Sequence, residues 1–119
     1  MDIADAISSH EDWRDRLLSY AKGNMLYRVD PDVAAKDGDC ALGQWLRGEG
    51  KAEYAGVPRF DELVIVHAAF HLEAAALVRM IAGGQAKQAR TLIADLRSPF
   101  NQASSKVVNL LTALQDATN

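Results

Sequence analysis

An apolar stripe at helical spacing constrains the fold of this chain more than any other feature. Its members recur every three to four residues over six turns, which places them on one face of a long helix. They are Phe60, Leu63, Val64, His67, Phe70, His71, Ala74, Leu77, Val78 and Ile81. Pro58 suits the first position of this helix, and Gly83-Gly84 ends it. Such a helix must bury its stripe, so the sequence predicts a core built from helices.

The segments before and after this helix carry the same spacing. Residues 2–22 form one stripe, and residues from about 85 onward form another, which includes Ala89 and Ile93. Ser98-Pro99 is typical of an N-cap and a first helical position, so we expect a last helix from there to about Leu114. The alternative is a single helix over residues 85–117 that is kinked at Pro99. The sequence shows no strand-like alternation.

The connection between the first and the long helix carries mixed signals. Residues 24–39 predict a crossover loop with one short helix near Asp30-Pro31-Asp32. Asp39 is then the predicted N-cap of a further short helix over Cys40 to Leu46, ending near Gly48 and Gly50. Cys40 would lie in its first turn, where backbone N–H groups favour a thiolate. We therefore predict an all-α fold, an antiparallel four-helix bundle with a short additional helix, as a single domain over residues 1–119.

Composition excludes several classes of protein. A chain of 119 residues with 49% hydrophobic residues can bury a core without disulfides, and its only cysteine excludes an intramolecular one. The net charge of −3 and the lack of a Lys/Arg run argue against nucleic acid as a partner. No stretch approaches about 20 consecutive apolar residues, and the N-terminus is acidic, so we expect no membrane association and a cytoplasmic location.

The three histidines and the cysteine form a candidate metal site. His67 and His71 are four residues apart, so they lie one above the other on a helix. His10 lies on the first stripe, four residues after Ala6, and also faces inward. Three imidazoles and the Cys40 thiolate make a closed tetrahedral set that suits Zn²⁺. The alternative is that they are hydrogen-bonded core histidines and a small buried thiol.

A family resemblance bears on this choice. The segment Cys40-Ala41-Leu42-Gly43-Gln44-Trp45-Leu46 resembles the Cys-x-Leu-Gly-x-Trp signature of the chemoreceptor zinc-binding domain. His67-Ala68-Ala69-Phe70-His71 resembles the family's His-x-x-x-His element, and His10 matches its upstream histidine. The resemblance runs from about Ile7 to Leu114. It implies that the zinc ligands are His10, Cys40, His67 and His71, that Gly43 allows close backbone approach, and that Trp45 packs the short helix onto the bundle.

The resemblance also implies a function. Domains of this kind sit beside chemoreceptor signalling helices or a diguanylate cyclase, and tune chemotaxis or cyclic di-GMP synthesis according to bound zinc or oxidant. We therefore expect a regulatory domain that forms a homodimer and acts on a signalling partner protein. A purely structural zinc is the alternative. Catalysis is disfavoured, because four protein ligands leave no position for water and Glu73 is not in a His-Glu-x-x-His arrangement.

A partner would need an exposed apolar surface. The side chains expected there are Leu18, Leu26, Val108 and Leu111. We expect Asp or Glu side chains, or carbonyl groups, to accept a hydrogen bond from the second imidazole N–H of each histidine.

Overall fold

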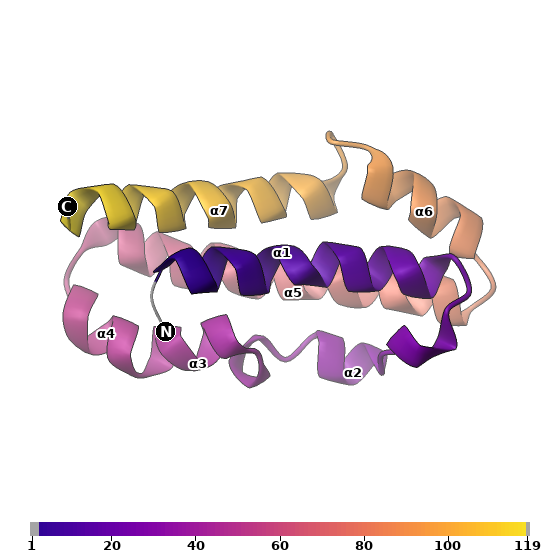
Figure 1. Ribbon diagram of the computed structural model, residues 1–119, viewed down its shortest axis with the longest axis horizontal. Coiled ribbons are helices and arrows are strands. Elements are labelled where there is room, and N and C mark those ends of the chain that lie inside the picture. The colour runs from indigo at the N-terminus through magenta and orange to yellow at the C-terminus, as the bar shows by residue number, and fades with distance from the viewer. Residues whose placement is uncertain (1–2, 119) are drawn as a thin grey trace.

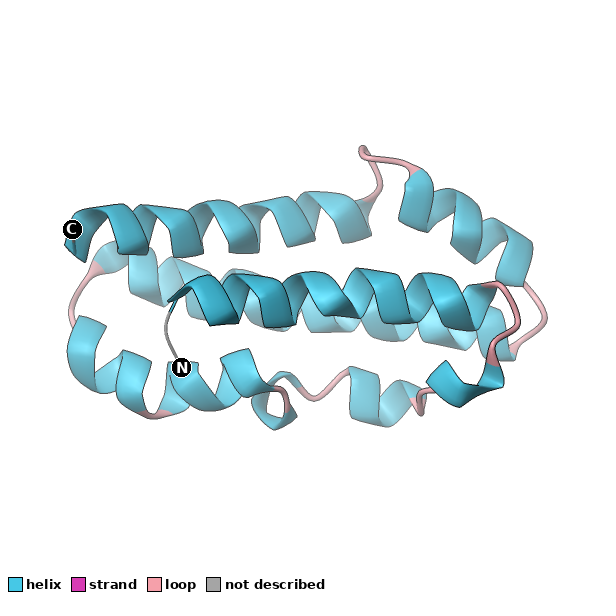
Figure 2. Ribbon diagram, in the orientation of Figure 1, coloured by secondary structure: helices cyan, strands magenta, loops and turns pink. Residues whose placement is uncertain are grey.

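The computed structural model describes the backbone of residues 3–118 and the side chains of residues 3–116. Within this range the chain contains helices, turns and loops, and no strand (Figure 2). The predicted all-α class is therefore confirmed.

Three long helices run along the 44 Å axis of the molecule: α1 (Ile3–Ala21), α5 (Pro58–Ala82) and α7 (Pro99–Thr118). Helices α1 and α5 point in one direction and α7 in the other (Figure 1). Helix α5 packs mainly against α7, and α1 contacts both. Most of the predicted stripe of α5 forms the centre of the core, where Leu63, Phe70 and Val78 are fully buried. Val64 is an exception, because it is 38% exposed.

In the chain, α1 and α5 are connected by a row of short helices and not by a fourth long helix. The row consists of η1 (Met25–Tyr27), α2 (Pro31–Ala34), η2 (Asp37–Asp39), α3 (Ala41–Arg47) and α4 (Glu49–Tyr54). The row runs opposite to α1 and α5 on the side away from α7 (Figure 1). Helix α2 packs on α5, and α3 contacts α1. The finer prediction of a four-helix bundle is thus not confirmed as such.

Helix α4 was not predicted, because Gly48 and Gly50 looked like the end of the preceding helix. In the structure, Gly50 lies under the ring of Trp45, where a Cβ atom would come within 2.8 Å of the ring carbons. The ring of Trp45 also lies 6.0 Å from that of Tyr54 and 6.3 Å from that of Phe60. Aromatic packing therefore holds α3 and α4 onto the start of α5, in agreement with the packing role implied for Trp45.

Helices α6 (Ala86–Ala94) and α7 are separate, so the alternative of one kinked helix is wrong. Proline at the start of α7 supplies no N–H to a preceding turn. The side-chain amide of Asn101 instead donates to the carbonyl oxygens of Ile93 and Asp95, both at 2.8 Å. These bonds satisfy carbonyl groups that the end of α6 leaves without helical partners.

By length and composition alone, α5 is a candidate membrane-spanning helix, which the count of consecutive apolar residues did not reveal. The core helix of a soluble protein meets the same criteria, and the inner face of α5 is buried here. Its outer face carries Ile65 and Leu72, which are 70% and 62% exposed.

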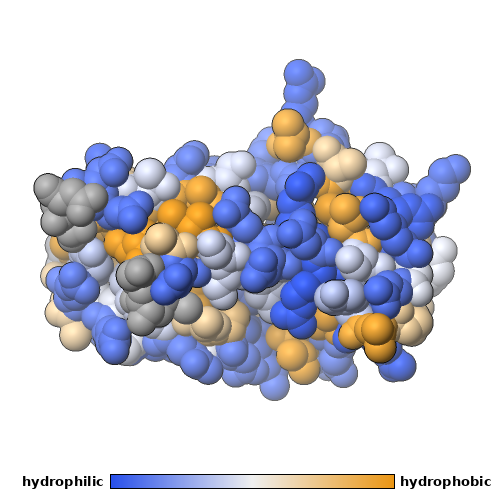
Figure 3. Space-filling model, viewed as in Figure 1, coloured by the Kyte–Doolittle hydropathy of each residue, from blue (hydrophilic) through white to orange (hydrophobic). Residues whose placement is uncertain are grey.

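The surface prediction was right for Leu26 and wrong for Leu111. Leu26 is 93% exposed, whereas Leu111 is 0% exposed. Leu111 is four residues after Val107 and three before Leu114 on the buried stripe of α7, so it belongs to the core. Leu18 and Val108 are half-buried. The face shown in Figure 3 is mostly hydrophilic, with separate apolar areas.

Candidate metal site

Two buried histidines on α5 form the base of the site. His67 and His71 are each 1% exposed and lie one helical turn apart. Their Nε2 atoms are 3.1 Å apart, and their rings meet edge to face at 77° with centroids separated by 4.6 Å. The four-residue spacing in the sequence therefore places both imidazoles at the same point in the core.

Cys40 reaches this point from the start of α3. Its Sγ atom lies 3.3 Å from Nε2 of His67 and 3.4 Å from Nε2 of His71. Cys40 is itself the N-cap of α3, and its sulfur accepts a hydrogen bond from the Gly43 N–H at 3.2 Å. The predicted cap, Asp39, instead ends the 3₁₀ helix η2.

Gly43, in the first turn of α3, lies very close to η2. A Cβ atom at position 43 would collide with the backbone oxygen of Asp37. Only glycine can therefore pack the first turn of α3 directly onto η2, which agrees with the role implied for it.

The three ligand atoms fit one face of a tetrahedral metal site. Their separations are 3.1, 3.3 and 3.4 Å. With Zn–N of about 2.05 Å and Zn–S of about 2.3 Å, a tetrahedron has N–N edges of about 3.4 Å and N–S edges of about 3.6 Å. The structure is thus within about 0.3 Å of the spacing that zinc needs. Among the described residues, Cys40, His67 and His71 form the group that could hold a metal ion.

The outer nitrogens of the two histidines have different surroundings. Nδ1 of His71 lies 2.9 Å from the carbonyl oxygen of Ala34 in α2. A carbonyl only accepts, so Nδ1 carries the proton and the Nε2 lone pair of His71 faces the site. Nδ1 of His67 is buried and has no hydrogen-bond partner among the described residues.

His10 is buried beside the site without belonging to the three-residue group. It is 3% exposed, and its ring lies 4.2 Å from that of Phe70. Its Nε2 atom is 3.1 Å from the hydroxyl oxygen of Ser104 on α7. The role of His10 as a fourth ligand stays a prediction.

Burial sets the protonation of the site. Burial, together with a smaller repulsion from His71, lowers the pKa of His10 from 6.5 to about 4 and that of His67 to about 3. The pKa of His71 is also lowered by burial. These imidazoles are therefore neutral at pH 7, which is the form that binds metal.

Burial has the opposite consequence for the cysteine. It raises the pKa of the Cys40 thiol, and this outweighs the lowering by the N–H groups of Gly43 and Leu42. The expectation of a free thiolate at the helix start was therefore wrong for the metal-free site. The thiol must lose its proton when a metal binds.

Comparison with known families agrees with this geometry. The chemoreceptor zinc-binding domain matches residues 10–78, which is more than half of the chain and includes all three histidines and Cys40. The chain belongs to the chemoreceptor zinc-binding domain family. Neither the curated proteins nor the solved structures contain a significant match to it.

Three groups that contact the histidines of this zinc-binding domain were not predicted from the sequence. The Ala34 carbonyl is a backbone group and leaves no signal in the residue type. Ser104 lies on α7, far along the chain from its partner His10. Trp13 places its ring edge-on to His71, with centroids 5.4 Å apart. Only Trp13 had a usable signal, because it shares the inward stripe of the first helix with His10.

Proposed function

We propose that this chain is a zinc-binding sensory domain in which His10, Cys40, His67 and His71 hold one Zn²⁺ ion. The observation that carries the proposal is the convergence of one sulfur and two imidazole nitrogens at 3.1 to 3.4 Å in a buried site. Nitrogen and sulfur donors in a tetrahedral arrangement suit zinc better than magnesium or calcium, which prefer oxygen. A closed set of four ligands leaves no place for a reacting water, so we assign no enzymatic activity.

The proposed signal arises from the elements that the site connects. His67 and His71 belong to α5, Cys40 begins α3, and His71 also holds the α2 backbone through Ala34. Binding of zinc would fix the row of short helices against α5, and its loss would loosen them. The free energy of metal binding then becomes a conformational change that a partner can detect.

Cys40 makes the site sensitive to oxidants as well. It is half-buried, whereas the three histidines are almost completely buried. It lines a hollow of about 330 Å³ that also contains Trp13, Lys36 and Asp39. An oxidant that enters this hollow and converts the thiolate to a sulfenic acid would remove the strongest ligand and release zinc.

For the setting of the domain we propose a homodimer in the bacterial cytoplasm that modulates a chemoreceptor or a diguanylate cyclase. The family's description supports the first kind of partner. Ile65 and Leu72, on the outer face of α5, are exposed apolar side chains that an apolar contact with a protein could cover. We also propose that the fold is a variant of the antiparallel four-helix bundle in which the row of short helices takes the place of the second helix.

A purely structural zinc is the second candidate. The observation in its favour is that α2, η2 and α3 are only three to seven residues long. Helices of this length are unstable alone and depend on tertiary contacts. A zinc ion that joins Cys40 to α5 would hold this row in place without any signal.

Metal analysis of purified variants tests the proposal. Under reducing, zinc-replete conditions the wild-type chain should hold about one zinc, and Cys40→Ala, His67→Ala and His71→Ala should lose most of it. Asp39→Asn is the matched control, because this exposed neighbour of Cys40 lies outside the ligand group. Circular dichroism of Cys40→Ala separates the two candidates: retained helix supports a sensor, and unfolding supports a structural zinc. Wild-type protein without zinc refutes both.

A further inference from the structure

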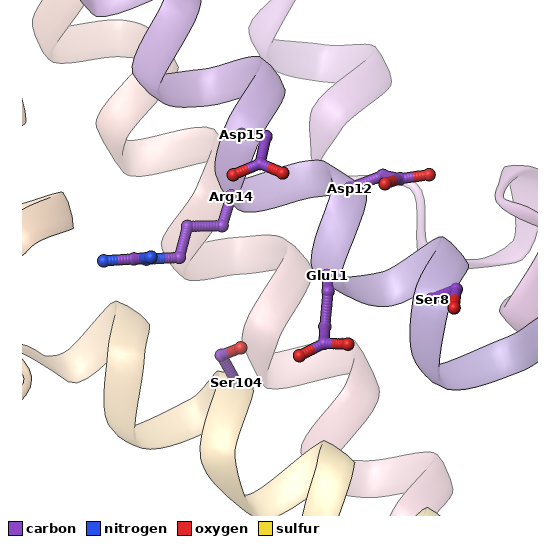
Figure 4. A pocket seen from close by; sticks show the side chains of 6 residues that line it. All are labelled: Ser8, Glu11, Asp12, Arg14, Asp15 and Ser104. Atoms are coloured by element: carbon purple, nitrogen blue, oxygen red, sulfur yellow. The ribbon is translucent and has the colours of Figure 1, made fainter. Parts of the chain in front are cut away.

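One ring nitrogen of His10 makes a contact that connects α1 to α7. Its Nε2 atom lies 3.1 Å from Oγ of Ser104, although the two residues are 94 positions apart in the chain. His10 is almost completely buried, and its ring rests against Phe70. Figure 4 shows Ser104 on α7 beside a polar hollow whose other lining residues come from α1.

His71 shows what such a contact does to an imidazole. Its Nδ1–H donates to the Ala34 carbonyl, so its Nε2 lone pair is available for a metal. The same reasoning applied to His10 gives the opposite assignment of nitrogens. Ser104 occupies Nε2, and therefore Nδ1 is the atom left to bind a metal.

The arrangement of the helices agrees with this assignment. In Figure 1, α7 lies on one side of α1, and α3, which Cys40 caps, lies on the other. The two nitrogens of an imidazole point away from the ring in divergent directions. A His10 ring whose Nε2 is directed to Ser104 on α7 therefore has its Nδ1 directed away from α7.

We propose that Ser104 is a positioning residue for the metal site. Its hydroxyl accepts a hydrogen bond from the Nε2–H of His10, fixes the tautomer with the lone pair on Nδ1, and presents that atom to the metal. This inference rests on the proposed function, in which His10 is a zinc ligand. The hydrogen bond to Ser104 would add α7 to the elements that zinc connects, because the metal would hold His10 on one side and α7 would hold it on the other.

The identity of the bound nitrogen gives the most direct test. Proton–nitrogen correlation spectra of the imidazole side chains, recorded on the zinc-loaded wild-type protein, distinguish the metal-bound nitrogen from the protonated one. We expect Nδ1 to be bound in His10 and Nε2 in His67 and His71. A His10 bound through Nε2 would overturn the inference, since that nitrogen could not then donate to Ser104.

Variants of α7 test the same claim through affinity. Loss of a hydrogen bond to the outer nitrogen of a ligating histidine lowers metal affinity by about 10-fold or more. We expect this loss in Ser104→Ala, as measured by competition with a chelator, and recovery of affinity in Ser104→Thr, which retains the hydroxyl. Ser105→Ala is the matched control, because Ser105 is exposed on the same helix. Its affinity should stay within about twofold of wild type, well below the 10-fold effect.

The His10→Ala background separates the possible failures. There, Ser104→Ala should cause no additional loss, because the imidazole that it positions is absent. If His10→Ala alone leaves zinc affinity unchanged, His10 is not a ligand and the proposed ligand set fails. If His10→Ala weakens binding but Ser104→Ala leaves it unchanged or tightens it, the set stands and the role of Ser104 is refuted.

Discussion

Zinc binding to the metal-free protein should release one proton per chain at pH 6 to 8. Burial keeps His10 and His67 neutral, with pKa values of about 4 and 3, and also lowers the pKa of His71. These groups have no proton to lose at pH 7. The Cys40 thiol has a pKa raised above its ordinary value of 9.0, so it is protonated and must release its proton to bind the metal.

The magnitude follows from this count of protons. With one proton released, the zinc association constant should rise about tenfold per pH unit, which corresponds to about 1.4 kcal/mol. Three histidines with ordinary pKa values near 6.5 would add up to about three more protons at pH 5.5, and the dependence would become much steeper there. The slope near pH 6 therefore tests whether the imidazoles are neutral.

Isothermal titration calorimetry in buffers of different ionisation enthalpy measures the number of protons directly. We expect one proton for the wild-type protein at pH 6, 7 and 8. Cys40→Ala is the control and should release none with whatever affinity remains. Release of two or more protons at pH 6 would show that the histidines are charged. Release of none at pH 7 would show that the thiolate already exists in the metal-free site.

Three further predictions concern stability. The metal-free fold should lose roughly 3 kcal/mol through His10 alone as the pH falls from 7 to 4, because the unfolded histidine gains a proton in this range and the buried one largely does not. Urea unfolding at pH 7 and pH 4 measures this loss, and equal stability at the two pH values would contradict it. Gly43→Ala should lower the free energy of unfolding by roughly 2 kcal/mol or more and abolish zinc binding, because the Cβ of the alanine would collide with the Asp37 backbone. An unchanged zinc affinity would refute this packing argument. Leu111→Ala should lower the free energy of unfolding, measured by chemical denaturation, by about 2–5 kcal/mol, whereas Leu26→Ala should change it by no more than about 0.5 kcal/mol. Equal effects of the two substitutions would contradict the assignment of Leu111 to the core.

The long helices could be predicted because their signals are local and repeated. The stripe of α5 extends over six turns, and Ser98-Pro99 marks the start of α7 with residues whose preferences are strong. The row of short helices was harder to predict, because the boundaries of these helices depend on contacts between separate turns. Cys40 rather than Asp39 caps α3, and Gly43 packs on the Asp37 backbone; local residue preferences predict neither feature.

The cluster of Cys40, His67 and His71 could be predicted from the sequence, but its chemistry only in part. Spacing indicated that His67 and His71 share one helical face, and the structure brings Cys40 to them. The prediction of a thiolate at Cys40 was wrong because desolvation of the sulfur raises the pKa of the thiol by more than the nearby N–H groups lower it. The extent of this desolvation depends on the whole fold and not on the local sequence. The contact of Ser104 with His10 escaped prediction for a related reason, because it depends on how α7 packs against α1.

The central claim is that the chain holds zinc through one sulfur and three nitrogen atoms. Zinc X-ray absorption spectroscopy of the protein loaded with one equivalent measures this coordination directly. The account predicts one Zn–S distance of about 2.3 Å and three Zn–N distances of about 2.0–2.1 Å. A spectrum without a sulfur shell, or one dominated by five or six oxygen atoms, would contradict it.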